Sequence, residues 1–151
     1  MFMAGYTGNY RTAVDDKGRL AIPARLRREG ADKLFLSPGF GPYLVLYPEG
    51  EWEEITKNLR NQPFTRGDFR DFSRYLYGNS QEVAPDGQGR ILIPENFLKE
   101  AGISGEATLI GVSRWIEIWS PARYQKFVTG FKPKWNKTAE KIIPGSMGGG
   151  A

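Results

Sequence analysis

The chain has 151 residues, a mass of 17.0 kDa and a formal net charge of +4, with 40% hydrophobic and 13% aromatic residues. This composition is sufficient for the core of one domain or of two small ones, so wholesale disorder is not expected. Because the sequence contains neither Cys nor His, it excludes disulfides, zinc sites built from these residues, cysteine nucleophiles and imidazole-dependent triads.

The positive charge is unevenly distributed along the chain. Residues 1–30 carry six basic and three acidic side chains, residues 31–119 nine and thirteen, and residues 120–151 six and one. Clustered positive charge favours a polyanionic partner, although a solvated charged face is the alternative. The sequence has no apolar run of membrane-spanning length and no signal-peptide pattern, so we expect a cytoplasmic protein without membrane association.

The first third of the chain has the pattern of strands around a sharp turn. Four segments have the composition of strands: YRTAV (10–14), RLAI (19–22), KLFLS (33–37) and YLVLY (43–47). The turn DDKG (15–18) joins the first two, because Asp nucleates turns through its carboxylate and Gly adopts a positive φ without strain. Pro23 suits the first turn of a helix, which we expect over residues 23–30.

Two amphipathic helices are predicted next. Apolar residues recur at helical spacing in both segments: Trp52, Ile55 and Leu59, then Phe69, Phe72 and Leu76. Such a stripe is more typical of a core or a subunit interface than of a cofactor site.

The turn and its strands then recur, so the chain is a duplication. DGQGRILIP (86–94) repeats DDKGRLAIP (15–23), and the second copy has its own strands and helix: SQEVA (80–84), RILI (90–93), PENFLKEAG (94–102), ATLIG (107–111) and WIEIW (115–119). SPARYQKFVTGF (120–131) predicts a terminal helix, and the Gly-, Pro- and Lys-rich remainder is expected to be disordered. We divide the chain into a first repeat (9–51), linking helices (52–79), a second repeat (80–123), and a terminal helix with a disordered basic tail (124–151).

The repeated Asp-x-x-x-Arg turn has a structural and a functional interpretation. Asp15 can accept backbone amides and pair with Arg19, which would stabilise a hairpin without any further role. Alternatively, the pair fixes a guanidinium whose fork of donors suits phosphate oxygens and the major-groove edge of guanine. Lys17 would add a flexible phosphate contact. Two copies of such a turn favour a protein that recognises a polymer with a repeating structure.

These residues resemble the MraZ family of bacterial regulators. The resemblance rests on DDKGRLAIPARLR, VLYPEGEW, GRILIP and IEIW in this order, over roughly residues 8–128. It implies an α+β, β-rich fold of two tandem AbrB/SpoVT-like swapped-hairpin, β-barrel-like repeats that form one compact unit, with linking and terminal helices. It also implies a ring-shaped homo-oligomer, expected to be an octamer. Its implied partner is double-stranded DNA, at direct repeats upstream of its own division and cell-wall gene cluster, where a nucleoid-associated repressor is expected.

The family's motif transfers to both turns of this sequence. In the family it lies on the DNA-binding face, which assigns DNA binding to Lys17, Arg19, Arg25 and Arg90, and support of the turns to Asp15, Gly18, Asp86 and Gly89. The second copy has Gln88 where the first has Lys17, so we expect the first copy to contribute more electrostatic affinity. The N-terminus departs from the pattern, since Gly8 is the best match to the family's early glycine. No catalytic residue, metal or cofactor is implied.

Two other classes of function fit the sequence less well. An enzyme would need a catalytic constellation, but the glycine-rich turns match neither phosphate-loop pattern, and adjacent carboxylates such as Asp15 and Asp16 are weak metal ligands. An oligomeric scaffold or antitoxin-like module of the same fold would bind protein, with residues 51–78 as its surface. Such a protein would not depend on Arg19 and Arg90.

Overall fold

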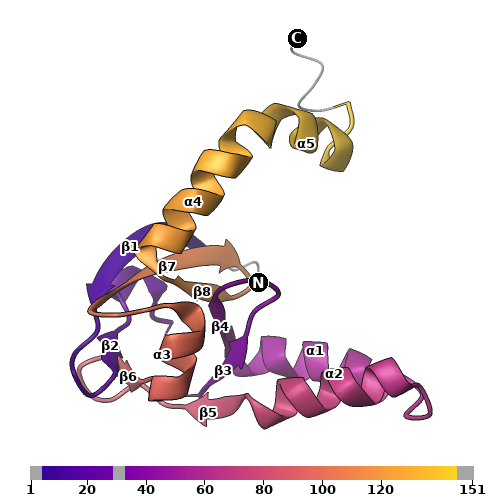
Figure 1. The fold of residues 1–151 in the computed structure, drawn as a ribbon, viewed down its shortest axis with the longest axis horizontal. Coiled ribbons are helices and arrows are strands. Elements are labelled where there is room, and N and C mark those ends of the chain that lie inside the picture. Colours follow the sequence, from indigo (N-terminus) through magenta and orange to yellow (C-terminus); the bar gives the residue numbers. More distant parts are fainter. Residues whose placement is uncertain (1–4, 29–32, 146–151) are drawn as a thin grey trace. The chain divides into compact units, whose positions relative to one another are not determined.

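The computed structural model describes residues 5–28 and 33–145, and the chain divides into two units, Met1–Pro121 and Ala122–Ala151. Figure 1 shows the elements of the first unit in chain order: β1 (Tyr6–Ala13), β2 (Arg19–Ala21), the 3₁₀-helix η1 (Ala24–Leu26), β3 (Leu34–Pro38), β4 (Leu44–Pro48), α1 (Glu49–Arg60), α2 (Gly67–Gly78), β5 (Gln81–Val83), β6 (Arg90–Leu92), α3 (Glu95–Ala101), β7 (Glu106–Ser113) and β8 (Ile116–Trp119).

The two repeats are interleaved in one six-stranded sheet of order β1-β7-β8-β4-β3-β5. The leading strand of each repeat pairs with the other repeat: β1 with β7, and β5 with β3. The last strands, β4 and β8, meet at the centre, where Leu44 lies opposite Ile118. A second, two-stranded sheet joins β2 to β6. This exchange of strands confirms the α+β, β-rich fold and makes one folded unit from two copies.

The sheet is open and does not close into a barrel. Its order begins at β1 and ends at β5, and β5 spans only three residues. The sheet is instead covered on both faces. This double burial explains why LVLYP in β4 is continuously apolar, since Leu44 and Leu46 enter one cluster while Val45 and Tyr47 enter the other,.

The first hydrophobic cluster joins the sheet to the β2–β6 ribbon and α3. Its fully buried members include Leu20, Leu36, Leu46, Leu109 and Ile118. The second cluster lies on the opposite face, where Trp52 of α1 and Leu76 of α2 pack with Val45 and Tyr47.

The helix predicted over residues 23–30 is wrong over its described part. Only Ala24–Leu26 is helical, as a single 3₁₀ turn, and Arg27 has extended backbone angles; residues 29 and 30 lie outside the described residues. The matching helix α3 buries both Phe97 and Ala101. From Ala24 to Arg28, the first copy buries only Leu26, so no apolar stripe favours a longer helix there.

The second unit is more ordered than the sequence suggested. A terminal helix was predicted over residues 120–131, and α4 spans Pro121–Phe131. The 3₁₀-helix η2 (Lys132–Lys134) and α5 (Trp135–Ile142) follow it, where disorder was expected. Aromatic residues spaced four apart pack along this unit: Phe127 stacks on Phe131 with ring centroids 5.6 Å apart, and Phe131 meets Trp135 edge to face at 6.3 Å. Such pairs stabilise helices. Residues 146–151 of the expected tail lie outside the described residues. Across the described ranges, every helix is too short or too polar to cross a bilayer.

Candidate nucleic-acid interface

The β2–β6 ribbon has one buried face and one exposed face. Leu20 and Ile91 are cross-strand neighbours, and both are buried in the first cluster. Because side chains alternate along a strand, the neighbours on either side point the other way. The register therefore places Arg19 opposite Leu92 and Ala21 opposite Arg90 on the outer face. The structure thus brings the two predicted arginines together, one from each repeat.

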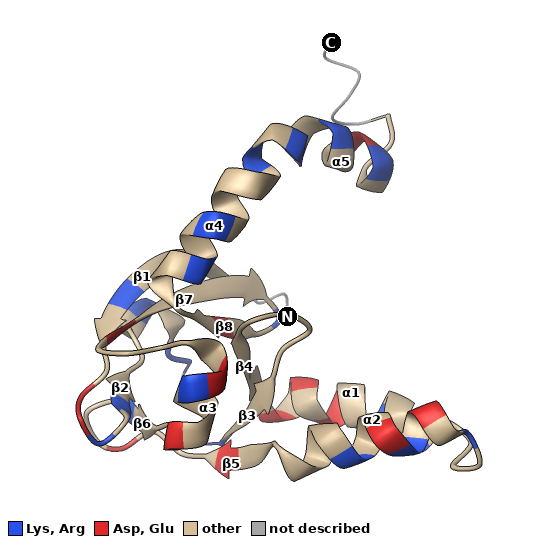
Figure 2. Cartoon of the chain, in the orientation of Figure 1, with Lys and Arg blue, Asp and Glu red and all other residues tan. Residues whose placement is uncertain are grey.

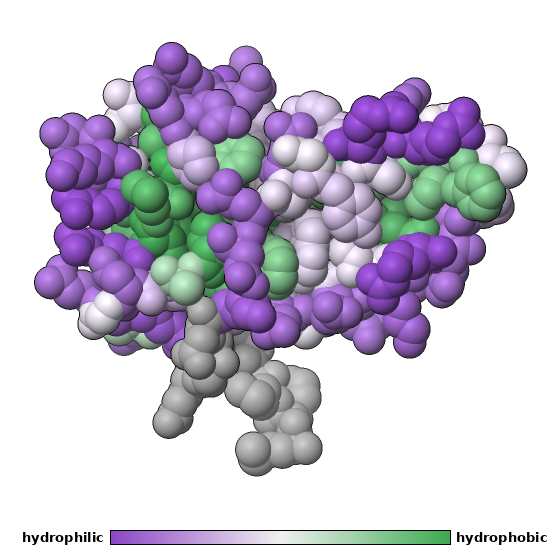
Figure 3. Space-filling view, turned by 90° about the horizontal axis from the view of Figure 1, so that it is seen from below, coloured by the Kyte–Doolittle hydropathy of each residue, from purple (hydrophilic) through white to green (hydrophobic). Residues whose placement is uncertain are grey.

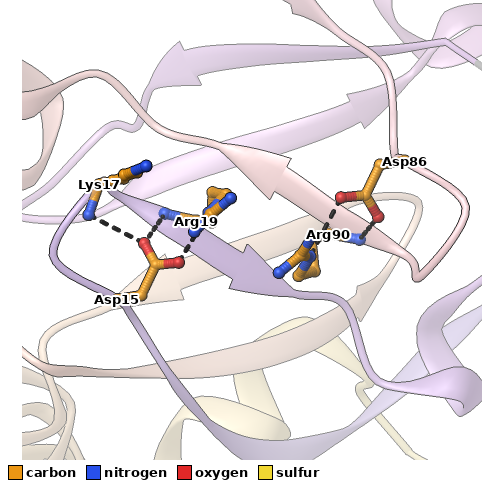
Figure 4. Close-up of polar contacts among 5 residues, drawn as sticks. All are labelled: Asp15, Lys17, Arg19, Asp86 and Arg90. Carbon is orange, nitrogen blue, oxygen red and sulfur yellow. Dashed lines mark hydrogen bonds and ion pairs between the residues drawn. The ribbon is translucent and has the colours of Figure 1, made fainter.

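Each arginine is held by the aspartate of its own turn, as the sequence predicted (Figure 4). The Arg19 amide and the Lys17 amide donate to Asp15 Oδ1 at 2.8 and 3.0 Å, and Arg19 Nε donates to Asp15 Oδ2 at 2.7 Å. Because this side-chain bond uses Nε, the four N–H donors on the two Nη atoms lie outside it.

The second turn repeats this geometry. The amides of Gln88 and Arg90 donate to Asp86 Oδ1 at 2.8 and 3.0 Å, and Arg90 Nε donates to Asp86 Oδ2 at 3.0 Å. About a third of each arginine side chain stays exposed, 38% for Arg19 and 34% for Arg90. Both guanidiniums are therefore oriented and still accessible.

The two turns also brace each other. Gly18 and Gly89 have φ of +86° and +76°, which L side chains rarely adopt. The Ile93 amide donates to Gly18 O and the Ile22 amide donates to Gly89 O, both at 2.9 Å. Each glycine thus shapes its own turn, and its carbonyl oxygen accepts a hydrogen bond from the other repeat. These backbone hydrogen bonds fix the separation of the two arginines.

The remaining basic residues differ in their surroundings. Lys17 is exposed at the tip of the first turn, and Arg25 is exposed on η1, just after the ribbon. Arg28 has an internal role, because its Nη2 donates to Gly5 O at 3.1 Å and its guanidinium lies 4.4 Å from the Tyr6 ring centre. Arg27 lies beside Gly89 of the second turn. Sequence reasoning missed this contact, because it joins the two repeats.

The turn carboxylates are stabilised in their charged form. Hydrogen bonds from the Arg19 amide, and then from its side chain and the Lys17 amide, lower the pKa of Asp15 below its ordinary 3.8 despite opposing desolvation. The Arg90 and Gln88 amides lower the pKa of Asp86 in the same way. Both groups stay ionised across the physiological range and hold their arginines.

These lowered pKa values predict an acid-sensitive contribution of the turns to stability. The turns should stabilise the fold fully above pH 3.8 and lose this contribution as pH falls through the lower, folded-state pKa values. We expect the difference in unfolding free energy between wild type and the Asp15→Asn, Asp86→Asn variant to be constant near neutrality and to shrink on acidification. Carboxyl ¹³C NMR titration of both residues measures the pKa values directly, and a midpoint at or above 3.8 would contradict this.

The outer face of the ribbon combines the two arginines with the exposed apolar side chains of Ala21 and Leu92. Figure 2 shows acidic and basic residues close together in the loops at the ends of β2 and β6. In residues 5–28 and 33–145, His, Cys, Asp and Glu form no group of three or more that would suit a metal ion. The arrangement offers oriented guanidinium donors to an external acceptor.

Comparison with known proteins is consistent with this geometry. The model of the MraZ protein family, which is described as antitoxin-like, matches residues 6–75 and again residues 76–142. A transcriptional regulator MraZ of Moorella thermoacetica is 38% identical over 138 residues, which cover 91% of this chain and 96% of the relative. Those of Pelotomaculum thermopropionicum and Heliobacterium modesticaldum are 38% identical over 143 residues (95% and 99%) and 36% over 138 residues (91% and 96%).

Proposed function

The chain belongs to the MraZ family, and from this premise we propose that it is a sequence-specific DNA-binding regulator of transcription that acts as a repressor. One observation carries the proposal: two guanidiniums, each oriented by its own aspartate, lie on the exposed face of one two-stranded ribbon. An antiparallel ribbon fits the major groove of B-DNA, and Arg binds guanine O6 and N7 through two donors. A member of a regulator family, the chain is not an enzyme.

Different residues of the interface have different proposed roles. Arg19 and Arg90 read base edges, since their Nη donors are directed by the Asp pairs. Lys17 and Arg25 contact phosphates, because they are exposed near the ribbon and their side chains are flexible, which suits positioning rather than reading. Asp15, Gly18, Asp86 and Gly89 support the turns.

A single ribbon with a few cations would bind DNA weakly, so we propose that the protein acts as a ring, expected to be an octamer. Subunits at a fixed spacing engage several direct repeats at once, and linked weak sites multiply in affinity. Exposed aromatic side chains near α1 and α2 support a subunit contact there: Phe40, Phe64, Phe72 and Tyr75. Figure 3 shows hydrophobic surface among hydrophilic residues over this half of the first unit. The proposed target lies upstream of the protein's own division and cell-wall gene cluster, in the nucleoid of the cytoplasm.

Fluorescence anisotropy against DNA from upstream of the protein's own gene tests this function. Wild type should prefer this duplex over a scrambled one, with affinity falling steeply with salt, by a log–log slope of about 0.9 for each phosphate contact. The Arg19→Ala, Arg90→Ala variant should lose the preference, because each bidentate base contact contributes about 1–3 kcal/mol of discrimination. Native mass spectrometry of each protein reports the oligomer.

The matched control removes the same charge elsewhere. Arg11→Ala, Lys33→Ala deletes two cations whose carboxylate partners, Glu106 and Glu82, are also exposed. Both lie outside the ribbon and outside α1 and α2, so this variant should keep the preference. If the ribbon variant binds as well as this control, the ribbon is a structural element. The alternative function, an oligomeric scaffold or antitoxin-like module that binds protein, would then lead.

A further inference from the structure

The two turns differ at their tips. Lys17 in the first turn corresponds to Gln88 in the second, and both are exposed. Their aspartates and arginines otherwise have matching bonds. Taken alone, the second turn therefore lacks a cation next to its arginine.

A cation from the first repeat lies beside the second turn. A Cβ added at Gly89 would lie 2.5 Å from Arg27 Nη1 and 2.9 Å from Arg27 Cζ, so the guanidinium lies directly against the turn. Arg27 also lines, with Asp86 and Gly87 at the turn's tip, a cleft of about 370 Å³. Within residues 5–28 and 33–145 no carboxylate forms an ion pair with Arg27, and the side chain is exposed.

The first turn shows the reverse arrangement. The residue that corresponds to Arg27 in the second repeat is Leu98, and its Cδ1 would lie 3.5 Å from a Cβ at Gly18. The turn with its own Lys17 is therefore flanked by an apolar side chain. The turn with the neutral Gln88 is flanked by an arginine. The two differences compensate, and each turn has one nearby cation.

We propose that Arg27 is the phosphate contact of the second turn, supplied across the repeats; this rests on the proposed DNA-binding function. DNA that is read by the ribbon face passes its backbones along the sides of the turns, where Arg27 lies. A guanidinium with exposed donors and no ion-paired carboxylate among the described residues binds a phosphate oxygen well,. The second repeat then contributes as much electrostatic affinity as the first, contrary to what Gln88 alone suggests.

The test separates charge from packing at this position. Arg27→Gln keeps a polar stem over Gly89 and removes the charge, whereas Arg27→Lys keeps the charge. Anisotropy titration of the full chain over several salt concentrations should show binding about tenfold weaker for Arg27→Gln, with a salt slope lower by about 0.9 for each engaged subunit. Arg27→Lys should stay within about threefold of wild type. Lys17→Gln should match Arg27→Gln, and combining the two should lower the slope by about 1.8.

The control Arg11→Gln removes one exposed arginine of β1, which lies outside the β2–β6 ribbon and outside α1 and α2, and it should bind like wild type. If Arg27→Gln matches this control, or if Arg27→Lys is as weak as Arg27→Gln at an unchanged melting temperature, Arg27 acts by shape and the inference is overturned. In both cases wild type would still prefer its own duplex and the Arg19→Ala, Arg90→Ala variant would not. If wild type itself shows no preference, the proposed function fails, and the inference with it.

Discussion

Gly18→Ala is expected to destabilise the protein by about 2–4 kcal/mol. Gly18 has a φ of +86°, and a Cβ there would clash with the Ile93 carbonyl oxygen. Backbone cannot rotate aside as a side chain can, and the Ile93 amide is itself bonded to Gly18 O. The loss therefore combines left-handed strain with a steric clash, offset slightly by the lower entropy of the unfolded Ala chain. Chemical denaturation of each variant measures it.

Three other glycines separate these causes. Gly105 has a φ of +75° with no atom near its Cβ position, so Gly105→Ala reports the strain alone, about 1–2 kcal/mol,. A Cβ at Gly89 would meet only the movable Arg27 side chain, so Gly89→Ala should also destabilise the protein by about 1–2 kcal/mol. Gly87 has no positive φ and no atom near its Cβ position, so Gly87→Ala should change stability by less than about 1 kcal/mol. Equal losses for Gly18→Ala and Gly105→Ala would show that the Ile93 contact is unimportant.

The local parts of the site could be predicted because they depend on neighbours in sequence. Asp15 and Arg19 are four residues apart around a glycine, and this spacing alone makes the carboxylate–guanidinium contact geometrically accessible. The duplication then predicted the same contact for Asp86 and Arg90. The strands were predictable for a similar reason, since YLVLY and WIEIW are too apolar and β-branched or aromatic for loops.

The long-range parts could not be predicted from the residues. Nothing within YRTAV shows that it pairs with β7 of the other repeat rather than with its own hairpin, because both partners offer the same apolar pattern,. The position of Arg27 against Gly89 follows from that exchange. Two helix predictions failed because helix length depended on apolar contacts. The η1 segment buries only Leu26, so it ends after one turn. The ordered α5 begins at Trp135, whose ring contacts Phe131 of α4.

Trp52→Ala is expected to destabilise the first unit by about 3–5 kcal/mol. The Trp52 side chain is buried between α1 and the sheet, where it stacks on Phe35 with ring centroids 5.1 Å apart. It also contacts the rings of Tyr47 and Tyr77, at centroid distances of 5.7 and 6.2 Å. Its removal leaves a cavity and loses three ring contacts. Trp52→Phe keeps part of the stack and should lose only about 1–2 kcal/mol. Denaturant unfolding, with limited proteolysis of the α1–α2 segment, measures both effects.

A tryptophan of the second unit provides the matched control. Trp135 is 59% exposed, so Trp135→Ala should lose less than about 1 kcal/mol. The β2–β6 ribbon belongs to the other hydrophobic cluster, through Leu20 and Ile91. Proteolysis of Trp52→Ala should therefore begin in α1 and α2, while amide exchange at Leu20 and Ile91 stays slow. Equal losses for the two tryptophan variants, or first exposure of the ribbon, would mean that the two faces of the sheet are not energetically separate.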